Sequence, residues 1–409
     1  MTKFFTILAA ATLASCVSSI KLPPQLEAQA SLVEGSNNFA VDLYGEVSTE
    51  PGNVFISPVS ISAAFGLLYP GTRGNTATEI ADVMGYNLPT DADFASTMGG
   101  LLDALQADRD TSKLRIANAA WVREDAKLAN EYRDTIKSRM RAEISSINFS
   151  MPEVARKAIN DWVLAATNDH IDNLIPSGFI DPNDTYLVLT NAVWFKADWA
   201  DQFQAAKTLT DAFTGRDGKV SSVRYLTDKR DVRYVDSGNF HAVELDYASD
   251  GFAMAFLLPK DVNGLSALEA SLASGGVSRT LNSLSAAKPV LVDLKIPKVT
   301  TSVSYKLPEP LERLGLRQAF RKDANLSGLF DHGSFMVSDV VHKTFLEINE
   351  KGTEAAAATA IGVTLTSGQM SPPKFVEFHA KHPYLIVLRH KATGAILFIG
   401  RIEEPTPAE

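Results

Sequence analysis

The segment that most constrains the fold is LVLTNAVWF, Leu187–Phe195, in which nearly every residue is apolar. A strand with one solvent-exposed face alternates apolar and polar residues, whereas a short continuous apolar run is typical of a strand buried on both faces. Such a strand requires other elements on each side of its sheet. The sequence therefore predicts a layered fold of mixed helices and strands around a large core.

Helical and strand patterns are interleaved along the rest of the chain without a regular β–α–β alternation. The predicted elements are helices over residues 32–47, 61–68 and 76–84 and strands over residues 53–58, 251–259, 289–296, 384–389 and 395–400. The helix over 76–84 begins with Thr76 as a plausible cap and Glu79 three residues later. The length of 409 residues would suit one large domain or several ordinary ones. No linker follows residue 32, so we expect a single domain over residues 31–409.

The N-terminal segment has the pattern of an export signal. Lys3 precedes an apolar run, residues 4–13, which is too short to span a bilayer as a helix. The run ends in Leu-Ala-Ser-Cys, which resembles the lipobox of bacterial lipoproteins, whose cysteine is lipidated after cleavage. An ordinary signal peptide with a chance cysteine is the alternative. We expect residues 1–15 to be removed, Cys16 to carry lipid, and residues 16–30 to form a tether in which Pro23-Pro24 blocks helix formation.

Composition narrows the class of protein. Apolar residues make up 45% and charged residues 21% of the chain, which are globular values. The formal charge is −9, and the basic residues are scattered, so no nucleic-acid partner is indicated. Cys16 is the only cysteine, so the chain has no internal disulfide and its core must hold it together.

The sequence contains no local catalytic motif. His-Glu-x-x-His, Gly-x-Ser-x-Gly, Walker and Gly-x-Gly-x-x-Gly motifs are absent. A cysteine nucleophile is excluded because Cys16 lies in the export signal. His379 and His382 are three residues apart, but Pro383 follows, which favours a strand entry over a metal site. We expect that the protein is not an enzyme and binds no metal or cofactor. A hydrolase whose catalytic triad is assembled from distant residues remains an alternative hypothesis, but no local motif supports it.

An alanine run near the C-terminus, EKGTEAAAATAIG over residues 350–362, is open to two interpretations. Alanine is the best helix former, which favours a short surface helix. The β-branched Thr359, Ile361, Val363 and Thr364 favour a strand instead, and no apolar stripe is present to dock a helix. The helix and strand interpretations of this segment are distinguished by other segments of the chain.

Several segments together resemble the serpin family. Residues 342–359 closely resemble the serpin hinge, and residues 378–384 resemble the family signature. Five further segments are similar to serpin blocks, namely residues 53–62, 71–76, 191–196 with Trp199 and Phe203, 324–328 and 396–401. The resemblance covers about residues 31 to 403. It implies a mixed α/β (α+β) serpin fold with three β-sheets, about eight or nine helices and an exposed reactive loop.

The resemblance also implies a mechanism and a set of site residues. A serpin inhibits a serine protease as a suicide substrate: the cleaved loop inserts into the central sheet while the acyl-enzyme persists. The implied hinge is Glu350, Gly352, Thr353, Glu354, Ala355, Ala356, Ala357 and Ala358. The implied shutter, a buried polar cluster beneath the sheet opening, is Ser57, Ser60, Asn191 and His342, and Trp199 marks the breach at the top of the sheet. Counting from Glu350 places the reactive bond at Thr366–Ser367, with Leu365–Thr366 second and Met370 third.

The hinge sequence fits insertion. If Thr353 is the first residue to face the protein interior, every second residue after it in the inserted strand also faces inward, and none of these is charged. Glu354, the only acid, points outward. We call these inward-facing residues the inward set. No proline lies between residues 350 and 366, so no ladder hydrogen bond is lost. This favours an inhibitor over the alternative, a non-inhibitory serpin-fold surface binding protein whose loop is cleaved without trapping.

The expected partner is an elastase-, chymotrypsin- or subtilisin-like serine protease, because no Lys or Arg lies between residues 352 and 374. Cysteine proteases are a further class of target. We expect a monomer that meets the membrane only through its lipid anchor, exported to a bacterial envelope at the outer membrane, the periplasmic face or the cell surface. The stretch Leu101–Val122 has only dispersed basic residues, so no polyanion cofactor is indicated.

Overall fold

The computed structural model describes residues 23–408 except 89, 107–110, 141–142, 250, 274, 333–334 and 354–374. The helices in these residues are α1 (Pro24–Val47), α2 (Pro58–Leu68), α3 (Gly74–Met84), α4 (Asp91–Gln106), α5 (Asn130–Thr135), α6 (Pro152–Ala166), α7 (Leu265–Leu272), α8 (Gly276–Ala286) and α9 (Pro308–Arg313). The strands are β1 (Val54–Ile56), β2 (Ser112–Arg123), β3 (Glu143–Ile147), β4 (Leu187–Asp198), β5 (Leu209–Thr214), β6 (Val220–Asp236), β7 (Phe240–Asp246), β8 (Phe252–Pro259), β9 (Pro289–Pro297), β10 (Val299–Lys306), β11 (Asp339–Ile348), β12 (Gly352–Thr353), β13 (Val376–His379), β14 (Tyr384–His390) and β15 (Ile396–Ile402).

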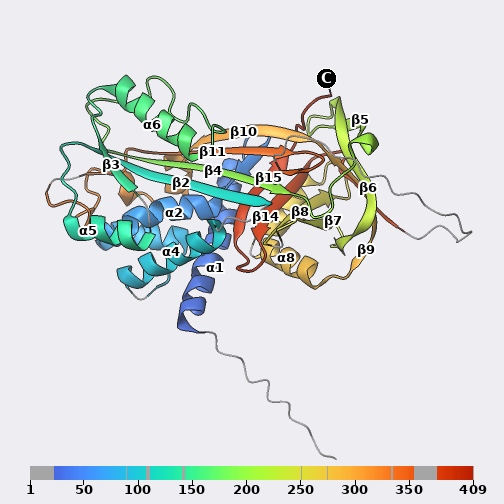
Figure 1. The fold of residues 1–409 in the computed structure, drawn as a ribbon, viewed down its shortest axis with the longest axis horizontal. Helices are drawn as coiled ribbons and strands as arrows, with labels where there is room; N and C mark the ends of the chain where they lie inside the picture. The colour runs from blue at the N-terminus through green and yellow to red at the C-terminus, as the bar shows by residue number, and fades with distance from the viewer. Residues whose placement is uncertain are drawn as a thin grey trace, which may run out of the picture.

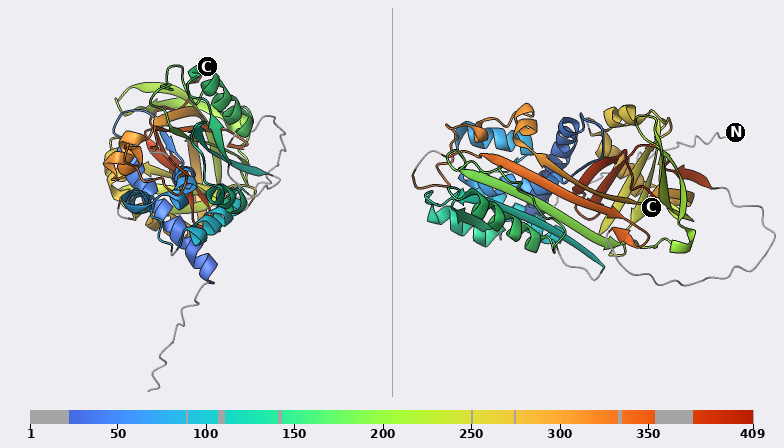
Figure 2. Two further views of the ribbon diagram at one scale, coloured as in Figure 1. Left: turned by 90° about the vertical axis from the view of Figure 1, so that its left-hand side faces the viewer. Right: turned by 90° about the horizontal axis from the view of Figure 1, so that it is seen from above.

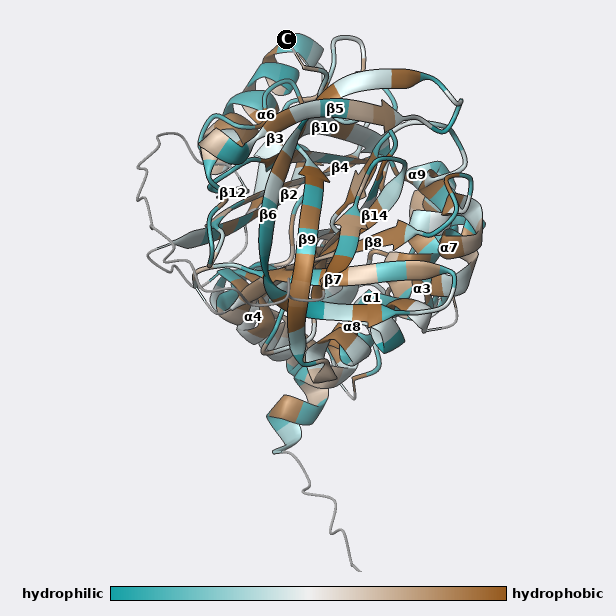
Figure 3. Ribbon diagram, turned by 90° about the vertical axis from the view of Figure 1, so that its right-hand side faces the viewer, coloured by the Kyte–Doolittle hydropathy of each residue, from teal (hydrophilic) through white to brown (hydrophobic). Residues whose placement is uncertain are grey.

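A nine-stranded sheet follows the order β1-β15-β14-β8-β7-β6-β9-β13, with β5 paired to β6. The long strand β6 belongs to two layers, because Tyr225–Arg233 pairs with β9 and Arg233–Asp236 pairs with β7. Two of the three expected sheets are thus joined through β6. Figure 3 shows apolar and polar segments following one another along β6 and β9, whereas β8, β14 and β15 are buried along their whole length. The predicted hairpin is confirmed as β14 and β15.

The second sheet has six strands in the order β10-β11-β12-β4-β2-β3, with an additional pairing of β11 to β4. Its strands run side by side across the molecule, which is clearest in the right-hand view of Figure 2. α6 lies on the outer face of this sheet, and α2, α4 and α5 lie on the opposite side (Figure 1). A separate apolar cluster joins α6 to β2 and β4, while the main core fills the other side. The apolar run Leu187–Phe195 is explained by its position in β4, which is covered on both faces.

Two local predictions are wrong. The tether over residues 16–30 was expected to lack helix, yet α1 already begins at Pro24. Proline is tolerated at the first helical position because the N–H that it lacks would have no partner there. The cap of α3 is not Thr76, because the helix begins at Gly74. Thr76 instead accepts a hydrogen bond from the backbone N–H of Asn325 at 2.9 Å.

Within the described residues, no helix has the length and apolar content needed to cross a membrane. The export signal and Cys16 lie outside those residues, as do Glu354–Ala358 of the hinge and the predicted reactive bond.

Candidate functional site

β4 and β11 pair with each other over only part of their length. Their parallel pairing joins residues 188–193 to residues 339–344 and ends at Val193 and Thr344. At the far end β12 lies between them, with Thr353 opposite Ala197 on one side and Ile348 on the other. We call the intervening residues, 194–196 of β4 and 345–347 of β11, the fork. The sheet is therefore closed at one end and already parted by a short antiparallel strand at the other.

A tight turn delivers the chain from β11 into β12. The Asn349 side chain accepts hydrogen bonds from the backbone N–H groups of Lys351 (3.0 Å) and Gly352 (3.3 Å). A β-carbon at Gly352 would lie 1.9 Å from the carbonyl oxygen of Ala197, so only glycine fits there. The hinge glycine is required by this close approach of two backbones, and its φ angle is not in the left-handed region.

Trp199 holds this turn from the end of β4. Its indole N–H donates to the carbonyl of Asn349 (3.0 Å) and its backbone N–H to that of Lys351 (2.7 Å). The indole is 2% exposed and stacks on the ring of Tyr247 with centroids 4.5 Å apart. The Tyr247 hydroxyl in turn lies 2.7 Å from the hydroxyl of Thr353. One aromatic pair thus contacts both the turn and the first inward residue of the hinge.

Glu350 anchors the outer edge of the same turn. Its carboxylate accepts hydrogen bonds from the ammonium of Lys298 and the hydroxyl of Thr208, each at 2.8 Å. Its carbonyl accepts a bond from the backbone N–H of Phe203 at 2.7 Å. Burial would raise the pKa of Glu350, but the hydrogen bonds from Lys298 and Thr208, a backbone hydrogen bond and the charge of Lys298 together hold the pKa below its usual value. The predicted hinge is therefore held on both sides of the turn.

The four predicted shutter residues lie together where β4 and β11 are still paired. The Asn191 amide donates to the Ser60 hydroxyl at 2.5 Å, and its oxygen meets Nδ1 of His342. The backbone N–H of Ser57 donates to Nε2 of the same imidazole at 3.1 Å. Asn118 of β2, which the sequence did not single out, also accepts from the Asn191 amide and donates to the carbonyl of Ser60 at 3.0 Å. All four predicted residues are fully buried.

These contacts fix His342 as neutral. Nε2 can accept from the Ser57 N–H only if it carries no proton, so the single proton sits on Nδ1 and donates to Asn191. Burial lowers the pKa of His342 to about 3. A protonated ring would place two N–H groups against each other at Ser57. The cluster thus joins α2 and the residue before it, Ser57, to β2, β4 and β11 through a group that stays uncharged at neutral pH.

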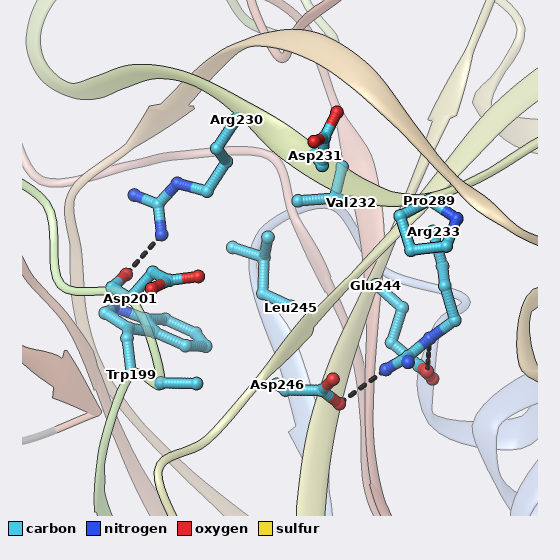
Figure 4. Close-up of a pocket in the computed structure, with 11 residues that line it drawn as sticks. Trp199, Asp201, Arg230, Asp231, Val232, Arg233, Glu244, Leu245, Asp246 and Pro289 are labelled. Atoms are coloured by element: carbon cyan, nitrogen blue, oxygen red, sulfur yellow. Dashed lines mark hydrogen bonds and ion pairs between the residues drawn. The ribbon is translucent and has the colours of Figure 1, made fainter.

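Trp199 also lines a cavity of about 110 Å³ (Figure 4). Its charged lining residues are largely paired: Arg233 contacts Glu244 at 3.0 Å and also Asp246, and the Arg230 guanidinium donates to the carbonyl of Asp201. The lining contains no Ser, His or Cys. In the described part of the chain, no three His, Cys, Asp or Glu side chains are grouped to hold a metal ion. The cavity offers no hydroxyl, thiol or imidazole group, and we regard it as part of the packing around Trp199.

Sequence reasoning missed the partners of the predicted residues. Tyr247, Lys298 and Thr208 contact the hinge from elements far away in the chain, and no local pattern marks them. Asn118 carried a weak signal, since it is a polar residue at the centre of the otherwise apolar segment IANAAW. Its inward contact became evident only from its register opposite Asn191.

Comparison with known proteins gives a consistent result. The family profile described as "Serpin (serine protease inhibitor)" matches residues 34–405. Human Serpin B4 is 34% identical over 394 residues, covering 92% of this chain and 100% of that protein. The leukocyte elastase inhibitor of Xenopus tropicalis is 32% identical over 389 residues, covering 92% and 100% respectively. The crystal structure of human thyroxine-binding globulin superposes with a TM-score of 0.83 at 28% identity, covering 93% of this chain and 100% of that one.

Proposed function

The chain belongs to the serpin family, whose members typically inhibit proteases, and from this premise we propose that it traps serine proteases by inserting its cleaved loop at the fork. The protease serine would attack the carbonyl carbon of Thr366. The peptide bond to Ser367 would break, leaving an ester to the enzyme and a new amine on Ser367. The loop N-terminal to the ester would then enter the sheet as a strand, carrying the protease with it before water can hydrolyse the ester.

The register of β12 carries this proposal. β12 is antiparallel to both β4 and β11, so each residue after Thr353 takes one step back along both strands. Residue 359 would arrive between Asn191 and His342, which are already opposite each other. β4 and β11 therefore keep their present register, and insertion requires only a sideways separation of about 4.8 Å, one strand spacing.

The same register supports the predicted inward set. Thr353 is 2% exposed and faces the main core at Tyr247, so alternate residues from Ala355 onward would face that core too. Each new ladder hydrogen bond contributes about 1 kcal/mol net, and a dozen of them plus apolar burial would offset the cost of ordering the loop. A charged inward side chain would cost several kcal/mol.

The residues at the predicted reactive bond favour elastase-, chymotrypsin- or subtilisin-like proteases as targets. Thr366, or Leu365 if cleavage falls one residue earlier, offers no positive charge to a trypsin-like pocket. Cysteine proteases form an analogous thioester and are a second class to test. The test is to mix the mature protein with an elastase-like protease, boil in SDS and analyse the products by mass spectrometry. An adduct of summed mass together with a peptide starting at Ser367 is expected.

The likeness to thyroxine-binding globulin, crystallised in complex with its ligand, favours one alternative: a non-inhibitory binding protein with a serpin fold. Such a protein would be cleaved in its loop without forming an adduct. Cleavage without adduct across a panel of chymotrypsin-like and subtilisin-like enzymes would contradict the inhibitory proposal and support this one.

We also propose that the protein is exported and anchored through Cys16, where it would shield a bacterial envelope from foreign proteases. The Leu-Ala-Ser-Cys sequence supports this proposal. Mass analysis of the mature N-terminus tests it: a diacylglyceryl cysteine is expected. A Cys16→Ser variant that still fractionates with membranes, or a wild-type protein found only in the cytoplasm, would contradict it.

A further inference from the structure

Two lysines face each other on neighbouring strands at the open end of the six-stranded sheet. The antiparallel register of β2 and β4 places Lys113 directly opposite Lys196, a residue of the fork. Both point away from the main core, because their neighbours Leu114 and Phe195 lie in that core and side chains alternate along a strand. Directly opposite side chains have their β-carbons about 4.5–5.5 Å apart. We call Lys113 and Lys196 the lysine pair.

The lysine pair has no acidic partner in the described part of the chain. Lys113 is exposed and Lys196 is half-buried, and neither ammonium group forms a hydrogen bond or an ion pair with a residue that the structure describes. By contrast, the ammonium of Lys343, on the same face of β11, lies 3.5 Å from the carboxylate of Asp172. Like charges directly opposite each other destabilise a sheet. The lysine pair therefore costs the sheet stability unless a negative charge is brought to it.

The register of β12 directs the next residue of the chain to the lysine pair. Thr353 is already paired with both β4 and β11. If the strand continues, residue 354, a glutamate, comes opposite Lys196 on one side and Glu347 on the other. Thr353 is buried against Tyr247 in the main core, so the side chain after it would point to the outer face, where the lysine pair lies.

The two direct neighbours of this carboxylate would nearly cancel each other. Lys196 would attract it and Glu347 would repel it, each from one strand spacing away, about 4.8 Å. The amide of Asn349 holds the side chain of Glu347 in place through a hydrogen bond of 2.9 Å. Lys113 is one strand further away, but its flexible side chain can lean toward the carboxylate. The second lysine therefore decides whether this position attracts or repels a negative charge.

We propose that Lys113 is a positioning residue of the inhibitory reaction: together with Lys196 it binds the carboxylate of Glu354 as the loop enters the fork. The inference rests on the proposed function. The occupant of this site is a segment of the chain itself, beginning at residue 354. Repulsion within the lysine pair raises the free energy of the native sheet, and the glutamate removes that repulsion in the inserted sheet. The lysine pair thus favours insertion through both states.

This role predicts opposite effects of Lys113→Gln on the two states. The native form loses a repulsion and should be as stable as wild type or more stable, whereas the form with an inserted strand loses an ion pair. An exposed ion pair changes an equilibrium by roughly 1.4- to 5-fold, and strand entry should slow by a factor in that range. A merely structural contribution of Lys113 would lower the stability of both states together.

The experiment is a double-mutant cycle of wild type, Lys113→Gln, Glu354→Gln and the double variant. Lys137→Gln, which changes an exposed lysine in the segment after α5, is the matched control. Each protein is mixed with a panel of elastase-, chymotrypsin- and subtilisin-like proteases, and the ratio of adduct to cleaved protein is read from SDS gels. Denaturant midpoints of the native proteins are measured alongside.

The sign of the glutamate effect should depend on Lys113. In wild type, Glu354→Gln should lower the ratio of adduct to cleaved protein by roughly 1.4- to 5-fold. In the Lys113→Gln background the repulsion from Glu347 is no longer outweighed, so the same substitution should leave the ratio unchanged or raise it. At about 1 M NaCl, where the screening length is about 3 Å, these differences should shrink.

Lys196→Gln removes the other member of the lysine pair and should act in the same direction if Lys113→Gln fails to fold. An identical effect of Glu354→Gln with and without Lys113, or a native Lys113→Gln protein less stable than the Lys137→Gln control, would overturn the inference while leaving the proposed function intact. If wild type forms no adduct with any protease of the panel, both the inference and the proposed function fail.

Discussion

The two sheets of this protein differ in how continuously their central strands are paired. In the nine-stranded sheet, β7, β8, β14 and β15 pair continuously with antiparallel neighbours, and a buried Glu244–Arg389 pair ties β7 to β14. In the six-stranded sheet, the central β4–β11 pairing stops after six residues and gives way to the fork. A new strand could enter between β7, β8, β14 and β15 only by breaking a ladder, whereas the fork already holds β12 between β4 and β11 in a defined register. If the chain inserts its loop as we propose, the change should be confined to the six-stranded sheet.

The largest expected effect comes from a charge on the inward face of the hinge. Ala357→Glu would place a carboxylate between Val193 and Thr344 in the main core if the β12 register continues. Burial of that charge costs several kcal/mol, so trapping should fall on the order of 100-fold in favour of simple cleavage. The ratio of adduct to cleaved protein on SDS gels measures this. Val220→Glu, on an exposed position of β6, is the control, and a similar loss of trapping there would contradict the register.

The second prediction concerns the nine-stranded sheet. Glu244 is 2% exposed and accepts two hydrogen bonds from Arg389, at 2.7 and 2.9 Å. Glu244→Ala leaves that guanidinium buried without its partner, at a cost of about 3–5 kcal/mol. If this region stays the same on insertion, as the proposed function requires, native and cleaved forms should lose stability alike in denaturant unfolding. A loss confined to the native form would show that the nine-stranded sheet also rearranges. Lys157→Ala, in an exposed ion pair on α6, is the control.

The third prediction concerns pH at the closed end of β4 and β11. The pKa of His342 is about 3 in the folded protein, against an ordinary value of 6.5. Between these values the unfolded chain binds a proton that the folded chain does not, so stability is full above pH 6.5 and falls as the pH drops toward 3. The slope from this group is at most about 1.4 kcal/mol per pH unit.

Denaturant midpoints measured from pH 7.5 to 5 test the assignment. Burial also lowers the pKa of His241 and His382, so a variant that lacks His342 should still show part of the wild-type slope. His342→Gln should be less stable at pH 7.5 but show a shallower decline. An unchanged slope in this variant would contradict the neutral His342 that the contacts require.

The smallest effect is expected at the outer edge of the hinge. Glu350→Gln keeps the shape of the side chain but removes the charge that Lys298 neutralises at 2.8 Å. A partly exposed pair of this kind contributes up to about 1 kcal/mol. A synthetic peptide copying residues 353–365, followed by native gels, should therefore be incorporated into the native protein faster by roughly fivefold or less. Lys207→Gln, in the exposed pair with Asp228, is the matched control. Slower incorporation in Glu350→Gln would mean that the pair assists opening.

Local sequence patterns predicted the helices and strands well, but they did not predict which residues contact the site. The apolar run of β4, the β14–β15 hairpin and α2 were evident because period and turn chemistry are local. The start of α1 was misjudged because the rule that proline breaks helices does not hold at their first residue. Tyr247, Lys298 and Asn118 reach the site through sheet register, which one sequence does not encode locally. The hinge and shutter residues were named through the family resemblance, and their contacts came only from the structure.

Hydrogen exchange of the native and the loop-cleaved protein tests the central claim most directly. The account predicts that peptides covering residues 194–198 of β4 and 345–348 of β11 gain strong protection on cleavage, while peptides from β8, β14 and β15 are unchanged. In Ala357→Glu the gain should be absent. Cleavage without protection at the fork in wild type, or protection that rises equally in both sheets, would contradict the claim that the six-stranded sheet alone admits the loop.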